Sequence, residues 1–147
     1  MLLLGIKNTA TQSVATDNLI DFGSIYRKYC RKCAGTPTFA FTDGDSISLQ
    51  QSGMYHLTIT AVGTGDVAGD VTLQLIENGI AVPSAISTQT ITTPTTEIRT
   101  FVIDYYILVN STCLLGTPTT LAKTISVQST GVDATFTSVV ANVEKVS

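Results

Sequence analysis

The sequence predicts an all-β protein, an antiparallel β-sandwich of the jelly-roll type with about eight strands. Threonine, valine and isoleucine make up 51 of the 147 residues, and β-branched side chains favour extended backbone. Apolar and polar residues alternate along several segments, which is typical of strands that bury one face. Turn-rich stretches separate these segments, and no convincing helical pattern interrupts them, so the strands are expected to pair antiparallel.

The N-terminal third has the weaker strand signal. Residues 1–17 lack clear periodicity, and we interpret them as an N-terminal arm that precedes a jelly-roll domain at 18–147. Between the arm and Gly53, a turn is predicted at 42–45. Three segments around it read as extended: residues 19–29, 37–41 and 46–50.

A clear strand begins at Gly53. Within MYHLTITAV, alternate positions form one apolar face, which carries Tyr55, Leu57, Ile59 and Ala61. His56 lies on the opposite, threonine-rich face. Glycines at 63, 65 and 69 are expected to interrupt regular structure after this strand, because glycine favours turn conformations.

The next segment predicts a tight hairpin. VTLQLIE at 71–77 alternates again and leads into Asn78-Gly79, the pair that best supplies two positive φ angles. Pro83 follows in the returning segment. Since proline cannot donate a ladder hydrogen bond, that strand should be short, lie at a sheet edge, or end there.

The most hydrophobic strand spans 96–109. One of its faces carries Phe101, Ile103, Tyr105, Ile107 and Val109, and the other carries Val102, Tyr106 and Leu108 beside Thr100 and Asp104. Apolar residues on both faces indicate burial on both sides, by the sandwich interior and by another subunit. Two strands at 123–129 and 135–146 complete the pattern. Four residues are candidates for either the core or the subunit interface: Tyr55, Phe101, Ile103 and Tyr105.

Charge and composition exclude several function classes. The net charge is −3 and the pI is about 4.8, so the chain lacks the basic surface that nucleic acid requires. No apolar run reaches the 18 or so residues of a membrane span, so we expect no membrane insertion. The leucines at the start of the sequence have no basic residue before them, and Lys7 and Asn8 end the apolar run, so we expect no signal peptide. His56 is the single histidine, and no Ser, Cys or Asp arrangement supports a catalytic role for it; we interpret it as a surface or interface residue.

Three cysteines, an odd number, fit a reducing cytoplasm better than a disulfide framework. Cys30 and Cys33 have the CxxC spacing of a zinc knuckle, but its second ligand pair is missing, with only Cys113 and His56 left as distant ligands. We therefore expect no metal and no cofactor.

Two further clusters have both a functional and a structural interpretation. One hexapeptide carries four basic residues, interleaved with Tyr26 and Tyr29: Arg27, Lys28, Arg31 and Lys32. The cluster suits an acidic partner or, less well, nucleic acid, and it equally suits a strand edge protected by charge. The other cluster comprises loop carboxylates that suit calcium, although ordinary turn chemistry explains them better: Asp43, Asp45, Asp66 and Asp70.

The stretch Gly53-Met54-Tyr55-His56-Leu57 followed by VTLQLIENGIAV resembles the trimeric jelly rolls of the tumour necrosis factor (TNF) and complement globular-head superfamily. The closing VVANVEKVS looks like the last strand of such domains. The pattern, over 19–146, is also similar to virion proteins of bacteriophages that infect gut bacteria: head fibres, capsid decoration proteins and tail-tip proteins. The resemblance implies three subunits packed around an axis through aromatic and aliphatic residues of the inner sheet.

The resemblance leads to a functional hypothesis. Without a Gly-X-Y collagen stalk or a signal peptide, a cytokine or complement role is not expected. We expect a non-enzymatic virion protein, made in the host cytoplasm, that trimerises as a head fibre or capsid decoration protein and attaches through residues 1–17. The alternative is a tail-tip domain whose loops bind a receptor or a host-surface glycan. An enzyme ranks third, because no carboxylate pair is positioned by the sequence.

Overall fold

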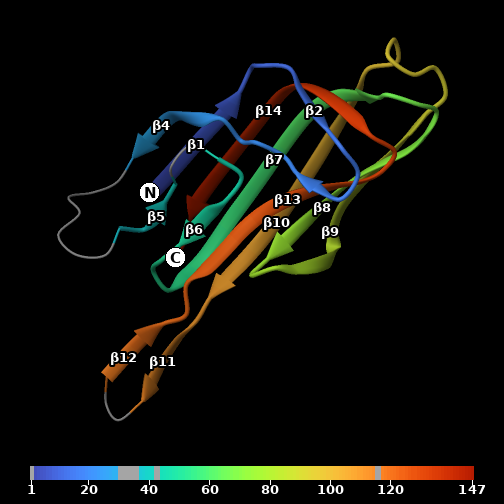
Figure 1. Cartoon of the computed structure of the whole chain (residues 1–147). Helices are drawn as coiled ribbons and strands as arrows, with labels where there is room; N and C mark the ends of the chain where they lie inside the picture. The colour runs from blue at the N-terminus through green and yellow to red at the C-terminus, as the bar shows by residue number, and fades with distance from the viewer. Residues whose placement is uncertain (1, 30–36, 42–43, 115–116) are drawn as a thin grey trace.

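Two antiparallel β-sheets pack face to face in the computed structural model, which describes residues 2–29, 37–41, 44–114 and 117–147 (Figure 1). Eight strands have six or more residues: β1 (Leu2–Asn8), β4 (Ser24–Tyr29), β7 (Gly53–Gly65), β8 (Gly69–Glu77), β9 (Ile80–Ile91), β10 (Arg99–Val109), β13 (Lys123–Gly131) and β14 (Ala134–Lys145). Six are shorter: β2 (Gln12–Val14), β3 (Asn18–Leu19), β5 (Phe39–Ala40), β6 (Ile47–Leu49), β11 (Ser111–Leu114) and β12 (Thr117–Thr120). The predicted all-β sandwich is confirmed.

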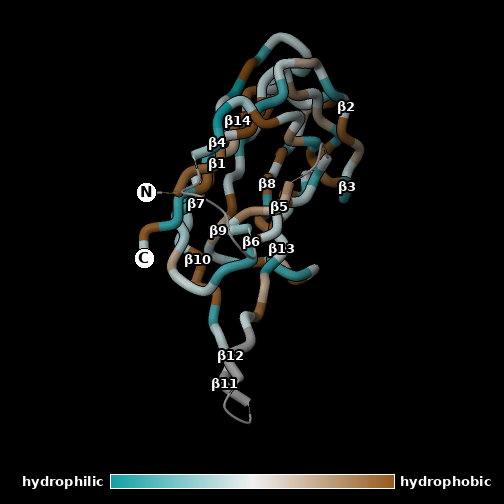
Figure 2. The backbone as a smooth tube through the Cα atoms, turned by 90° about the vertical axis from the view of Figure 1, so that its left-hand side faces the viewer, coloured by the Kyte–Doolittle hydropathy of each residue, from teal (hydrophilic) through white to brown (hydrophobic). Residues whose placement is uncertain are grey.

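Each layer has a defined strand order. Sheet A runs β10-β7-β14-β1-β4, with β2 also paired to β14, and sheet B runs β5-β6-β13-β8-β9, with β3 also paired to β13. Strands β11 and β12 pair only with each other in the described part, and this hairpin extends beyond the sandwich in both views (Figures 1 and 2). Among these same residues no helix is long and apolar enough to cross a bilayer.

The N-terminal segment belongs to sheet A. Strand β1 pairs with β14 from Leu2↔Lys145 to Asn8↔Val139, and it pairs with β4 on its other side. Leu4 and Ile6 are fully buried in the core. The interpretation of residues 1–17 as an arm outside the domain is therefore wrong for β1 and β2. The alternation of β1 was hidden because two of its outward positions carry leucine and glycine, Leu3 and Gly5, and only Lys7 is polar.

The core lies between the sheets and follows the predicted alternation. Successive buried positions of β7 are Tyr55, Leu57, Ile59 and Ala61. The ring of Tyr55 meets Phe39 edge-on at a centroid distance of 5.9 Å, and Phe101 meets Phe136 in the same way at 5.8 Å. Truncation of such a buried aromatic side chain to alanine costs about 3–5 kcal/mol. The contact between Tyr55 and Phe39 therefore joins the two layers, whereas Phe101 and Phe136 pack against each other on the core side of sheet A.

Both proline and glycine expectations need refinement. Asn78 and Gly79 have φ angles of 51° and 79°, which confirms the two-residue hairpin between β8 and β9. Strand β9 lies at the edge of sheet B, as Pro83 predicts, yet it is long. Strand β7 continues through Gly63 instead of breaking there: a Cβ at this position would lie 2.5 Å from the carbonyl oxygen of Thr135. Glycine permits this close approach of β14.

Candidate functional site

The outer face of sheet B carries many hydrogen-bonded polar side chains, together with the exposed Ile86 of β9. The hydroxyls of Thr72 and Thr88 lie 2.9 Å apart across β8 and β9, and Thr90 donates to the Asp70 carboxylate at 2.7 Å. The Gln128 amide donates to the carbonyl of Asp17 at 2.8 Å. Hydroxyls and amides that satisfy one another in this way form a surface suited to water.

Sheet A has a different outer face. Along β10, every second side chain is buried, and the residues between them present an exposed apolar row: Val102 is 50% exposed, Tyr106 58% and Leu108 47%. Asp104 lies within this row. We call Val102, Tyr106 and Leu108 the β10 row. Apolar residues at three of the four outward positions from 102 to 108 are typical of a contact surface rather than a solvated one.

The four candidate residues lie on the other side of the same strands. Tyr55, Phe101 and Ile103 are buried between the sheets, and Tyr105 is half-buried against them. The structure therefore places all four with the core. Burial raises the pKa of Tyr55 to about 12, and its hydroxyl donates to the Gln51 carbonyl at 2.7 Å. Sequence reasoning recorded the apolar character of the opposite face but did not name the β10 row among the candidates.

His56 completes this face beside β10. Its register partner on β10 is Tyr106, and the two rings stack at 4.6 Å between centroids with an interplanar angle of 16°. The imidazole Nε2 lies 2.5 Å from Oδ1 of Asp104, and Glu144 is the register partner of His56 on β14. These contacts hold the imidazole against Tyr106 and leave the predicted role, a surface or interface residue, in place.

A second cluster lies at the opposite edge of the same sheet. Tyr26 covers Gly5, where a Cβ would come within 2.9 Å of the tyrosine Cζ atom. The Tyr26 hydroxyl donates to Oδ1 of Asn142 at 2.8 Å, and the ammonium group of Lys7 lies 5.4 Å from the ring centroid. A cation at this distance is attracted by the ring face. These four residues form the Tyr26 cluster.

Of the basic hexapeptide, Arg27 and Lys28 lie on β4 next to this cluster, and both are exposed. Arg31 and Lys32 lie outside the described residues, as do Cys30 and Cys33. The side chain of Cys113 is likewise not described. The expectation that these cysteines bind no zinc therefore stays a prediction.

The described aspartates of this group accept hydrogen bonds from hydroxyl side chains. Asp66 accepts a hydrogen bond from Thr135 at 2.7 Å, Asp70 accepts from Thr90, and Asp45 accepts from the adjacent Ser46 at 3.1 Å. Asp43 lies outside the described residues. Within the described ranges, no group of three or more metal-binding side chains forms. These bonds come from hydroxyl side chains and not from the local backbone, so the turn interpretation of these aspartates stays a prediction.

Sequence reasoning did not single out Glu97. This carboxylate closes the β9–β10 loop: it accepts from the backbone N–H groups of Thr92 at 2.8 Å and Thr93 at 3.0 Å, and it pairs with Arg99. The two backbone hydrogen bonds, then the arginine, lower its pKa to about 2. The available sequence signal was a carboxylate that follows the turn-forming stretch TTPTT, because such a side chain can accept hydrogen bonds from the N–H groups of the turn.

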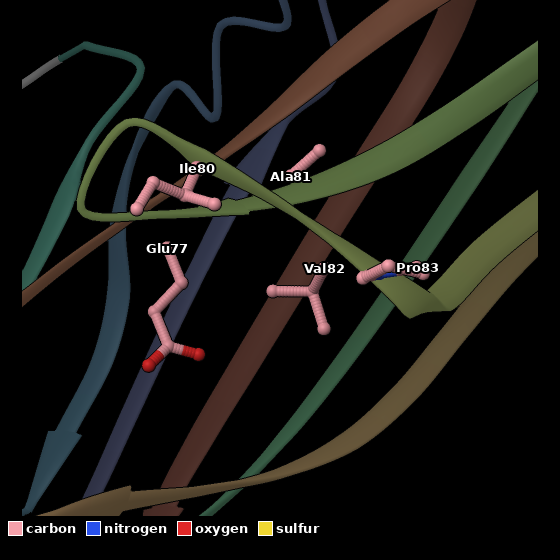
Figure 3. Close-up of a pocket in the computed structure, with 5 residues that line it drawn as sticks. All are labelled: Glu77, Ile80, Ala81, Val82 and Pro83. Carbon is pink, nitrogen blue, oxygen red and sulfur yellow. The ribbon is translucent and has the colours of Figure 1, made fainter.

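A shallow hollow lies at the β8–β9 turn (Figure 3). Its lining is apolar apart from one carboxylate, and Figure 3 labels the residues: Glu77, Ile80, Ala81, Val82 and Pro83. Glu77 forms an ion pair with Lys123, so its charge is already compensated. With a single, paired carboxylate, this lining does not provide the two separate carboxyl groups of acid–base hydrolysis.

No protein-family model matches the chain, and no curated protein matches it. Solved structures do. The globular domain of a zebrafish complement 1qA protein has a TM-score of 0.65 at 9% identity, covering 100% of this chain and 98% of that one. Murine APRIL has a TM-score of 0.65 at 11% identity, covering 97% and 98%. The PRD1 vertex protein P5 has a TM-score of 0.58 at 18% identity, covering 99% and 97%. These likenesses establish a shared jelly-roll fold.

Proposed function

We propose that the chain is a non-enzymatic structural subunit of a bacteriophage virion, a head fibre or capsid decoration protein, which trimerises through the outer face of sheet A. The observation that carries this proposal is the β10 row. Sheet A exposes three apolar side chains along one strand beside the stacked pair His56 and Tyr106, whereas the exposed Ile86 of sheet B lies between Ser84 and Thr88 along β9. Covering that face with sister subunits removes the row from water.

The energetic gain is substantial for a small subunit. Complete burial of one large apolar side chain contributes about 1.5–3 kcal/mol, so a half-exposed one gains roughly 1 kcal/mol on docking. Three such side chains recur at each interface of a closed ring. A closed ring of three subunits has three such interfaces, so the free energy of burial is gained three times and no subunit is left with an unpaired contact surface.

Two kinds of likeness support the assembly and its setting. The resemblance to TNF and complement globular heads implies a trimer, and the fold shared with the complement 1qA domain and APRIL is consistent with it. The fold shared with the PRD1 vertex protein supports a virion role. Attachment through residues 1–17 is not part of the proposal, because β1 and β2 are strands of sheet A.

Substitution of the β10 row tests the interface. The variant Val102→Thr/Tyr106→Ser/Leu108→Thr should lose the trimer and sediment as a single subunit, with an unchanged circular-dichroism spectrum. The matched control is Val67→Thr/Ile80→Thr/Ile86→Thr, which alters three side chains of similar exposure outside sheet A. The control should keep the wild-type mass. A trimeric β10 variant would overturn the proposed interface.

The virion assignment has its own test. Purified particles from an infected culture should contain the chain in a copy number divisible by three, measured by quantitative mass spectrometry. Genes for capsid or tail proteins should flank its own gene. Particles that lack the chain would refute the virion role and leave the interface test unaffected.

A further inference from the structure

We propose that the free edge of β4 binds an acidic segment of a partner protein, which adds to sheet A as an extended strand. Strand β4 ends sheet A, and no described strand pairs with its outer side. Alternate residues of such an edge direct their N–H and C=O groups away from the sheet. An extended peptide can satisfy these groups by strand addition. This inference does not depend on the proposed trimer.

This edge differs from the other sheet edges because it is exposed along its whole length and basic. On the opposite side of the sandwich, the amide of Gln89 on β9 donates to the carbonyl of Thr100 on β10 at 3.2 Å, which bridges the two sheet edges. The fourth edge strand, β5, has only two residues. By contrast, all six residues of β4 are exposed, including Ile25, Tyr26 and Tyr29. Charged side chains such as Arg27 and Lys28 deter most strands from pairing at an open edge, so the strand that this edge accepts is one of opposite charge.

The charge of this edge is uncompensated. Three described cations elsewhere have an oxygen partner: Arg99 pairs with Glu97, Lys123 pairs with Glu77, and Lys145 donates to the Ser147 carbonyl at 2.5 Å. The three cations at the β1–β4 edge form no ion pair with a described residue: Lys7, Arg27 and Lys28. The chain carries more carboxylates than cations, so these three could have been neutralised internally. Their charge favours an acidic partner.

The geometry favours a peptide over nucleic acid. Single-stranded nucleic acid binds by stacking its bases on open aromatic faces. Tyr26 packs over Gly5, and Lys7 is placed over its ring. Its hydroxyl is held by Asn142. This fixed side chain supports the strand edge but does not offer a free face for a base. Tyr29, 55% exposed, is the other tyrosine of β4, and one ring is fewer than the successive aromatic faces that single strands stack on.

A synthetic peptide tests the proposal directly. The probe is a fluorescent eight-residue peptide of alternating valine and glutamate, titrated against the full chain and followed by anisotropy. Its affinity should fall as salt is raised, because the contact is electrostatic. The variant Arg27→Gln/Lys28→Gln should bind it about tenfold more weakly. The matched control Ser84→Glu/Ile86→Glu makes the same −2 change in charge at the β9 edge and should bind as the wild type does.

A backbone control separates strand addition from charge attraction. The same peptide N-methylated at every residue keeps its charge but cannot donate ladder hydrogen bonds on either edge, so it should bind about tenfold more weakly. Amide exchange along β4 should slow only with the unmodified peptide. Three results would overturn the proposal. The unmodified peptide does not bind at concentrations up to about 1 mM, the methylated peptide binds as tightly as the unmodified one, or a single-stranded oligonucleotide binds the same edge more tightly than the peptide.

Discussion

Glu97 makes the most specific pH prediction at the scale of single residues. Its folded pKa of about 2 lies below the ordinary 4.5, so the ionised carboxylate stabilises the fold above about pH 4.5, and this contribution disappears as the pH falls toward 2. Glu97→Gln should be less stable than the wild type at pH 6, and the difference should shrink toward pH 2. Urea unfolding across this range measures it. A difference that does not vary with pH would contradict the role of the carboxylate.

At Ser129, in contrast, we expect a substitution to stabilise the fold. Its side chain is fully buried in sheet B, and its hydroxyl oxygen has no hydrogen-bond partner in the described structure. Burying an unpaired hydroxyl costs about 1–3 kcal/mol. Ser129→Ala should therefore raise the free energy of unfolding by about 1 kcal/mol, seen as a higher urea midpoint at an unchanged slope. A lower midpoint would show that the hydroxyl is satisfied.

Residue-level reasoning from sequence reached the core but not the surface. Alternation placed Tyr55, Phe101 and Ile103 on apolar faces, and all three are buried. Periodicity has no sign, however: it separates two faces of a strand without saying which one meets the other sheet. Asp104, an exposed charge between apolar neighbours, was the available indication that the β10 row faces outward.

Turns make the clearest prediction at the scale of elements. Gly131 and Gly79 both have positive φ angles, of 90° and 79°, but their surroundings differ. A Cβ at Gly131 would lie 2.1 Å from the carbonyl oxygen of Asp70, whereas a Cβ at Gly79 meets nothing within 4 Å. Gly79→Ala should cost about 1 kcal/mol, the backbone penalty alone. Gly131→Ala should cost about 3 kcal/mol, because the clash is added.

Thermal unfolding of the two glycine variants distinguishes the backbone penalty from the added cost of the clash. Equal losses would mean that the β13–β14 turn relaxes freely around the new methyl group. The stated order depends on backbone oxygen, which cannot rotate away as a side chain can, so Gly131 is expected to be the more sensitive position.

The position of β1 within sheet A predicts that its deletion unfolds the domain, whereas deletion of a separate arm would leave the domain folded. Deletion of residues 1–8 removes a strand that lies between β14 and β4 and takes Leu4 and Ile6 out of the core. Each lost leucine or isoleucine costs about 2–5 kcal/mol, and small domains have only about 5–15 kcal/mol in total. The truncated chain should be unfolded by circular dichroism. A folded truncation would show that β1 is dispensable.

Strands and turns were predictable from sequence where apolar and polar residues alternate clearly or where a turn pair stands between two strands. The hairpin at Asn78-Gly79 and the alternation of β7 and β8 needed only local information. Strand β1 did not show itself, because its outward glycine is covered by Tyr26 from β4, a contact between residues distant in sequence. Pairings of this kind depend on topology, which local pattern does not contain.

At the scale of the whole molecule, the two faces of the sandwich have different chemistry. The outer face of sheet B satisfies its own polar groups, while the outer face of sheet A carries the β10 row at one edge and the Tyr26 cluster at the other. Composition and alternation predicted the all-β sandwich. The difference between the faces emerged only once the sheet order placed β10 and β4 at opposite edges of one sheet.

The native mass of the unmodified chain tests the central claim most directly. If the β10 row is covered by sister subunits, multi-angle light scattering of the purified protein should give three times the 15.5 kDa of one chain. The mass should stay constant over a wide range of concentrations, since a closed ring does not grow further. A folded protein of 15.5 kDa at high concentration would contradict the account.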